Sequence, residues 1–120
     1  MIWAILHAIL TLIAIGFQFL LALGAPWGHL AMGGRFEGRL PVAMRVAAVM
    51  QGGLLVAMTR VVAGKAGLLA PVGPDWLIWG ILGVSALSAV MNLVTPSRAE
   101  RLLWGPVTVI MLWCVVMVSL

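Results

Sequence analysis

Charged side chains are scarce in this chain of 120 residues. Only 8% of the residues are charged and 64% are hydrophobic, whereas soluble domains have about 25% and roughly 45–50%. A soluble protein of this length cannot bury so much apolar surface. The composition therefore excludes an ordinary soluble domain and predicts that lipid surrounds most of the chain.

Cysteine and acidic residues are also few. The one cysteine, Cys114, lies within an apolar segment, so the chain cannot form an internal disulfide or a paired-cysteine zinc or redox site. The three acids are Glu37, Asp75 and Glu100, and none lies in the core of an apolar segment. This argues against a proton-coupled transporter that depends on an acid embedded in a membrane helix.

Four apolar stretches are each long enough to cross a bilayer core, which takes roughly 20 residues. They cover residues 2–23, 41–63, 76–94 and 99–120. The connections between them, residues 24–40, 64–75 and 95–98, are short and suit antiparallel neighbours. We therefore predict an all-α, polytopic membrane protein with a single domain over residues 1–120, built as a four-transmembrane-helix antiparallel bundle.

The first stretch could be mistaken for a signal peptide, because small residues follow it. However, its first 23 residues contain no lysine or arginine, and the apolar run is longer than a typical signal sequence has. We expect a helix that the mature protein retains.

The cations predict the orientation in the membrane. Five arginines belong to the side that carries residues 24–40 and 95–98: Arg35, Arg39, Arg45, Arg98 and Arg101. The opposite side has only Arg60 and Lys65. By the positive-inside rule, these two loops are cytoplasmic, while residues 64–75 and the N and C termini lie outside. The cations behind the net charge of +4 then set the topology and contact phospholipids. We expect no nucleic-acid partner.

The tryptophans fit the same orientation. Trp3, Trp76 and Trp79 fall at the predicted outer boundary, whereas Trp27 and Trp104 fall at the inner one. Such a distribution is typical of an aromatic belt at the two membrane interfaces.

Several residues suit the ends of the predicted helices. Gly24 stands where a left-handed cap closes the first helix, and Pro41 suits the first turn of the second. Ser97 and Glu100 have capping-box spacing, in which each side chain binds the other residue's backbone N–H. Asp75 is expected to cap the third helix.

Polar side chains within the spans form stripes on two helices. At 100° per residue, each stripe falls within about 60° of arc. The residues are His7, Thr11 and Gln18 on the first helix, Gln51 on the second, and Ser85, Ser88 and Asn92 on the third. They either join helices by hydrogen bonds or line a cavity, and Gln18 and Asn92 are placed to meet. Gln18, Gln51, Ser88 and Asn92 are our candidates for either role.

Catalytic chemistry has little support. His29, Glu37 and Glu100 share the predicted cytoplasmic face and are the only combination that resembles an acid–base site. No nucleophile elbow, phosphate loop or metalloprotease motif accompanies them. His7 belongs near the outer boundary, on the other side from His29, so we predict no metal site. We expect no cofactor, and we consider an enzyme doubtful.

Some segments resemble those of an uncharacterised family of small bacterial four-helix membrane proteins. They are "LALGAPWGHLAMGG" at residues 21–34, "LP" at 40–41 and "NLVTPSRAERLLWGPVT" at 92–108. The resemblance brings no activity with it. It implies four spans and a multi-pass location in the bacterial cytoplasmic (inner) membrane.

Three functions agree with these observations. The first is an accessory or structural subunit of a membrane assembly, or a homo-oligomer, without a catalytic centre. The second is a protein that binds or transports a lipid or small amphiphile at a cytoplasmic headgroup site. That site would use Arg35, Arg39, Arg45, Arg98, Arg101, His29, Glu37 and Glu100. The third is an oligomeric pore. Membrane lipids are the partners common to all three.

Overall fold

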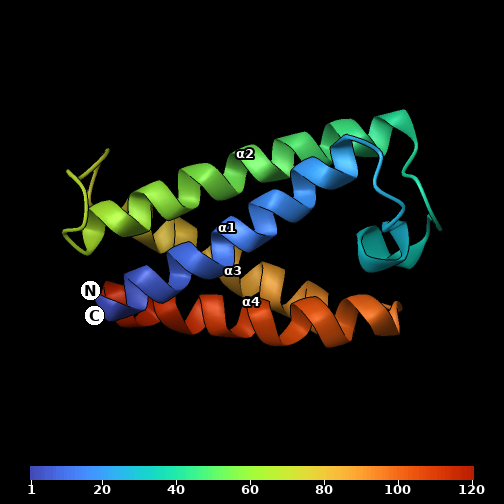
Figure 1. Cartoon of the computed structure of the whole chain (residues 1–120). Helices are drawn as coiled ribbons and strands as arrows, with labels where there is room; N and C mark the ends of the chain where they lie inside the picture. Colours follow the sequence, from blue (N-terminus) through green and yellow to red (C-terminus); the bar gives the residue numbers. More distant parts are fainter.

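The computed structural model describes all 120 residues, and all of its regular secondary structure is helical. Its four long helices are α1 (Ile2–Ala22), α2 (Val42–Lys65), α3 (Leu77–Val94) and α4 (Arg98–Ser119) (Figure 1). Two single-turn 3-10 helices, η1 (Gly28–Leu30) and η2 (Met32–Gly34), lie in the connection between α1 and α2. The helix bounds differ from the predicted segments by at most two residues, at the end of α2.

All four helices are long and apolar enough to cross a membrane. The expected all-α fold with four such helices is therefore confirmed. Large hydrophobic side chains such as Leu12, Met50 and Leu87 remain exposed on the outer surface. This is what lipid-facing helices require, because hydrocarbon solvates them and their backbone groups are satisfied within each helix.

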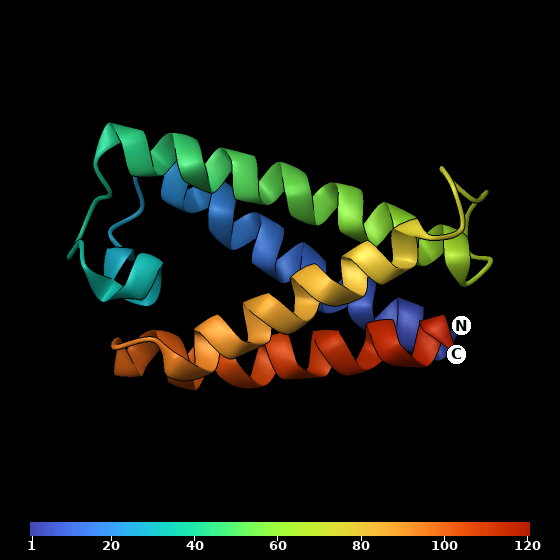
Figure 2. The same ribbon diagram turned by 180° about the vertical axis from the view of Figure 1, so that it is seen from behind.

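The helices pack as two antiparallel pairs. α1 lies along α2 and α3 lies along α4, and α1 also contacts α4. α2 and α3 are close only near their connecting loop and then diverge (Figure 2). The two chain termini lie together at one end, here called the terminal end, and η1 and η2 lie at the other, here called the loop end (Figure 1).

Two small apolar clusters hold the pairs together. At the terminal end, Ala4, Val62, Ile78 and Val115 bring all four helices into contact. At the loop end, a second cluster joins α1, α2 and their connection through Leu21, Ala31, Leu40 and Ala48. Alanines in both clusters allow close approach of the backbones. α3 takes part only in the first cluster, so it is free to diverge from α2 at the loop end.

The ends of α1 and α2 follow the expected chemistry. Gly24 has the positive φ of 103° that was expected after α1, and its N–H donates to the carbonyl oxygen of Leu21. Pro41 immediately precedes α2 rather than occupying its first turn, and its carbonyl oxygen accepts from the N–H of Arg45.

Two predicted caps need correction. Asp75 does not cap α3, because backbone bonds close that end instead: the N–H of Leu77 donates to the carbonyl oxygen of Pro74. Ser97 caps α4 by accepting from the N–H of Glu100. However, the Glu100 carboxylate does not return to Ser97, because it turns toward η2.

The fold of the connection depends on Gly28. Its N–H donates to the carbonyl oxygen of Gly38 over 2.9 Å, and a Cβ at this position would overlap the carbonyl oxygen of Phe36. A larger residue therefore has to displace backbone rather than a flexible side chain.

We expect Gly28→Ala to destabilise the protein by about 1–3 kcal/mol, as overpacking does in tight sites. The measurement is the apparent melting temperature in mild detergent. Gly83→Ala is the matched control, because a Cβ there meets nothing within 4 Å and alanine favours the helix. Equal losses of stability in the two variants would contradict this account.

Candidate binding cavity

A cavity of about 780 Å³ lies between the two helix pairs. Residues from all four helices and from η1 and η2 line it. The convergence of α2 and α3 closes it toward the terminal end, and the connection with η1 and η2 lies at the loop end (Figure 2). The cavity thus lies between the apolar cluster at the terminal end and the apolar cluster at the loop end.

The cavity opens sideways between α2 and α3. Leu54 on α2 and Leu87 and Met91 on α3 line it, yet they are 49%, 60% and 60% exposed. Side chains that line a cavity and are also exposed mark its mouth. A molecule beside the helices can therefore reach the cavity from the side rather than through the loop end.

The connection between α1 and α2 holds the cavity open. Ser97, the cap of α4, donates from its hydroxyl to the carbonyl oxygen of His29 in η1 over 2.7 Å. The N–H of Gly33 in η2 donates to Oε2 of Glu100 over 2.9 Å. Because Ala31 packs in the α1–α2 cluster, η1 and η2 lie between the start of α2 and the start of α4 (Figure 1).

Polar side chains are concentrated on the walls of this cavity. They come from every long helix: Gln18, Gln51, Ser85, Ser88, Asn92, Thr95, Glu100 and Thr108. All four candidates for a cavity or interhelical contact, Gln18, Gln51, Ser88 and Asn92, are among them. The remaining walls are apolar, with methionine, leucine, valine and aromatic side chains.

Gln18 and Asn92 do not meet. Nε2 of Gln18 donates to Oε1 of Gln51 over 2.9 Å and joins α1 to α2. Nδ2 of Asn92 instead donates to the carbonyl oxygen of Ser88 on its own helix over 2.8 Å. Gln18 and Gln51 therefore join two helices by a hydrogen bond and also line the cavity, so these residues have both of the expected roles.

Glu100 is the charged residue of the cavity. Its carboxylate is half-buried, and Oε2 accepts from Gly33 N–H and, over 3.3 Å, from the hydroxyl of Thr95. Its other oxygen, Oε1, accepts no hydrogen bond from the protein. Nη1 of the neighbouring Arg101 donates to the carbonyl oxygen of Thr95 rather than to the carboxylate.

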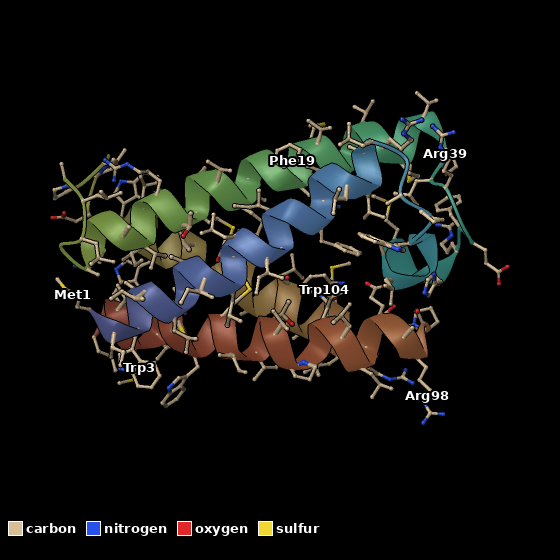
Figure 3. All side chains as sticks on the ribbon, viewed as in Figure 1. Met1, Trp3, Phe19, Arg39, Arg98 and Trp104 are labelled. Atoms are coloured by element: carbon tan, nitrogen blue, oxygen red, sulfur yellow. The ribbon has the colours of Figure 1, made fainter.

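An aromatic wall stands beside Glu100. Trp104 is 9% exposed, and its ring centroid lies 4.8 Å from that of Phe17. Phe17 in turn stacks on Trp27. Figure 3 shows Trp104 directed inward between α1 and α4. The ring of Trp104 therefore packs inside the bundle rather than on the lipid-facing surface expected of an aromatic belt.

The five arginines at the loop end do not gather at one place. Nε of Arg45 donates to the carbonyl oxygen of Ala22, and Arg39 lies against Gly24, so both cover the C-terminal end of α1, where cations are favourable. Arg98 lies on the opposite side of the loop end from Arg39 (Figure 3). Arg35 and Arg98 are exposed, and none of the five lines the cavity.

The three residues of the acid–base hypothesis remain apart. The side chains of His29 and Glu37 are exposed, and His29 contributes only its backbone oxygen to the contact with Ser97. No hydrogen bond links either side chain to Glu100. The structure therefore shows no direct hydrogen-bonded contact that would support the acid–base arrangement.

His7 is buried among the helices near the terminal end. Its exposure is 0%, because α1 turns this face toward the other helices, and Nδ1 lies 3.3 Å from the Thr11 hydroxyl oxygen on the next turn. No group of three His, Cys, Asp or Glu side chains in the structure is close enough to hold a metal ion.

The sequence contained a signal for the α4 wall that we did not use. Glu100, Trp104, Thr108 and Met111 recur every three or four residues and so share one face of a helix. All four line the cavity. We expected Glu100 in a capping box, in the acid–base combination and in the headgroup site, and Trp104 at the boundary. We did not group them with Thr108 and Met111, because a stripe of such mixed chemistry does not stand out by hydropathy.

Comparison with protein-family models, curated proteins and solved structures finds no match to this chain. The resemblance to the small bacterial four-helix family stays a prediction.

We expect Ser97→Ala to lower the stability of the protein. The substitution removes the cap of α4, which typically stabilises a protein by about 1 kcal/mol. It also removes the hydrogen bond to the carbonyl oxygen of His29. The apparent melting temperature in mild detergent is the measurement. Ser119→Ala is the control, because Ser119 binds only the carbonyl oxygen of Val115 in its own helix. A larger loss in the control than in Ser97→Ala would refute the role of this junction.

Proposed function

We propose that this chain is a multi-pass membrane protein that binds a small amphiphile between α2 and α3. The observation that carries the proposal is the cavity that opens sideways toward the bilayer, with polar groups on walls that are otherwise apolar. A close-packed interior would instead have favoured the purely structural role.

The size of the cavity supports a ligand. Its volume of about 780 Å³ lies within the roughly 300–1,000 Å³ that is usual for small-molecule sites. Buried polar atoms are almost always hydrogen-bonded, yet Oε1 of Gln18 and Nε1 of Trp104 on the cavity wall are buried without a partner. A polar ligand can satisfy such atoms after small rotations of the side chains.

The layout of the walls suggests how the amphiphile lies. Glu100 and Thr95 line the cavity at the loop end, near the first turn of α4. Met58 lines it farther along the bundle, about 24 Å from Val42 at the loop end of α2, at 1.5 Å per residue. A polar head then sits at the loop end and an apolar tail extends along the spans. Because lipid tails are as apolar as these walls, the tail adds little selectivity and the polar end decides what binds.

The arginine-lined headgroup site is less well supported than this cavity, because none of the five arginines lines it. Arg35 and Arg98 are exposed and suit the phosphates of surrounding anionic lipids. The oligomeric pore also has less support, because Ser88, Asn92 and Thr108 face a cavity within one chain.

An accessory subunit or homo-oligomer remains the second candidate. Gly53, Gly80 and Gly83 are exposed, and a Cβ at any of them meets nothing within 4 Å. Small residues on outer faces allow another helix to approach closely. Native mass spectrometry in mild detergent would support this candidate through a defined complex, and a strictly monomeric species would oppose it.

We propose the bacterial inner membrane as the location, with residues 24–40 and 95–98 in the cytoplasm and both termini outside. The excess of arginines at the loop end supports this orientation.

In a Cys114→Ala background, Leu69→Cys should react with a membrane-impermeant maleimide on intact spheroplasts. Glu37→Cys should react only after lysis. Both residues are exposed, so burial does not account for a difference between them. The reverse pattern would invert the proposed orientation.

Binding can be measured through Trp104. We expect an alkyl amphiphile with a brominated tail to quench the fluorescence of Trp104 in nanodiscs of zwitterionic lipid. Trp104→Phe supplies the background from the other tryptophans. Ser88→Phe should abolish the Trp104-dependent quenching, because Ser88 lines the cavity and the larger ring fills it.

Val90→Phe is the matched control on the same helix. Val90 is 55% exposed and does not line the cavity, so this variant should quench as the wild type does. Undiminished quenching in Ser88→Phe would contradict binding in the cavity.

A further inference from the structure

We infer that the cavity selects amphiphiles with a cationic, ammonium-type head, and that Glu100 is the residue that recognises this head. The inference rests on the proposed function and adds the chemical class of the ligand. It is opposite in sign to the anionic headgroup that the arginine count alone suggests.

The charge of the cavity carries the inference. Glu100 is the only ionisable side chain among the residues that line it. The other polar residues of the lining are amides and hydroxyls, which bear no charge. A charge near the hydrocarbon region is costly unless an opposite charge accompanies it, so the cavity favours a ligand that brings a positive charge.

No cation of the protein performs this role. Arg101 follows Glu100 in the sequence, but its Nη1 donates to the Thr95 carbonyl oxygen over 2.9 Å. Arg98 is exposed on the outer side of α4. The two donors that reach Glu100, Gly33 N–H and the Thr95 hydroxyl, are neutral and both bind Oε2. Oε1 therefore remains free to accept from an ammonium group.

The carboxylate is also fixed in position. Gly33 N–H holds Oε2 from η2, Thr95 holds it from the turn before α4, and Ser97 accepts from the backbone N–H of Glu100 itself. Gly33 adopts a positive φ of 74°, which glycine tolerates easily. A carboxylate held in this way loses little freedom when it binds a ligand.

The aromatic wall suits a cation as well. Trp104 lies one helical turn beyond Glu100 and therefore on the same face of α4. Its ring packs against Phe17, and both rings line the cavity. Aromatic faces attract ammonium groups, most strongly when water is excluded. An anionic head would instead meet the like charge of Glu100.

The test uses three dodecyl amphiphiles with the same brominated tail and different heads: primary ammonium, hydroxyl and sulfate. Each is titrated into wild-type nanodiscs of zwitterionic lipid, and its mole fraction in the bilayer is measured. Trp104-dependent quenching is the readout. We expect the ammonium compound to reach half-quenching at a mole fraction about tenfold lower than the hydroxyl compound, because charge-assisted hydrogen bonds are the strong ones.

Glu100→Gln should remove this preference, so that the ammonium and hydroxyl compounds reach half-quenching at similar mole fractions, because the amide is neutral while its oxygen can still accept from Gly33 and Thr95. Glu37→Gln is the matched control. It removes an acid from the same end of the molecule, but Glu37 is exposed and does not line the cavity. It should therefore keep the full ammonium preference.

A second variant keeps Glu100 and tests the same idea if Glu100→Gln does not fold. Asn92→Lys places an ammonium group on the α3 wall of the cavity, beside α4. It should abolish the preference for the ammonium compound, because the lysine ammonium pairs with the Glu100 carboxylate in place of the ligand's head.

The outcomes separate the inference from the proposed function. Equal quenching by all three compounds, a preference for the sulfate, or an ammonium preference that survives in both Glu100→Gln and Asn92→Lys would overturn the inference and leave amphiphile binding intact. Absence of Trp104-dependent quenching by any of the three compounds would overturn both.

Discussion

The hydrogen bonds between the first turn of α4 and the α1–α2 connection are the constraint on which the cavity depends. Ser97 binds the backbone of η1 and Glu100 binds the backbone of η2, while Ala31 and Leu40 anchor the same connection to α1 and α2. The connection therefore lies between the two helix pairs and keeps them apart at one end.

The proposed location in a membrane explains why such an opening can persist. In water, an apolar cavity of this size would be a large loss of stability, because the surrounding helices gain by closing on it. In lipid, hydrocarbon chains are as apolar as the walls, so an acyl chain can fill the space at little cost. The two apolar clusters and the loop-end junction then hold the helices together, and the proposed binding uses Glu100, Trp104 and the neighbouring amides of the cavity wall.

Much of the fold could be predicted from hydropathy and cap chemistry. Four apolar stretches end at turn residues, and Gly24 and Ser97 act as a helix end and a helix cap as expected. The failures share one cause. Asp75, Trp104 and the carboxylate of Glu100 were each interpreted from their immediate neighbours in the sequence. Their structural partners come from other segments, or, at Asp75, from a backbone turn that made a side-chain cap unnecessary.

The sequence by itself determined the number of helices, their approximate ends and the apolar surface that they present to lipid, because these properties depend on short-range periodicity and composition. Only the tertiary structure decided that α2 and α3 diverge, that Gln18 pairs with Gln51 rather than Asn92, and that Glu100 faces the cavity while the arginines do not. Such outcomes depend on contacts between residues that are distant in sequence. The local sequence pattern does not determine which polar side chains will pair between helices once the bundle forms.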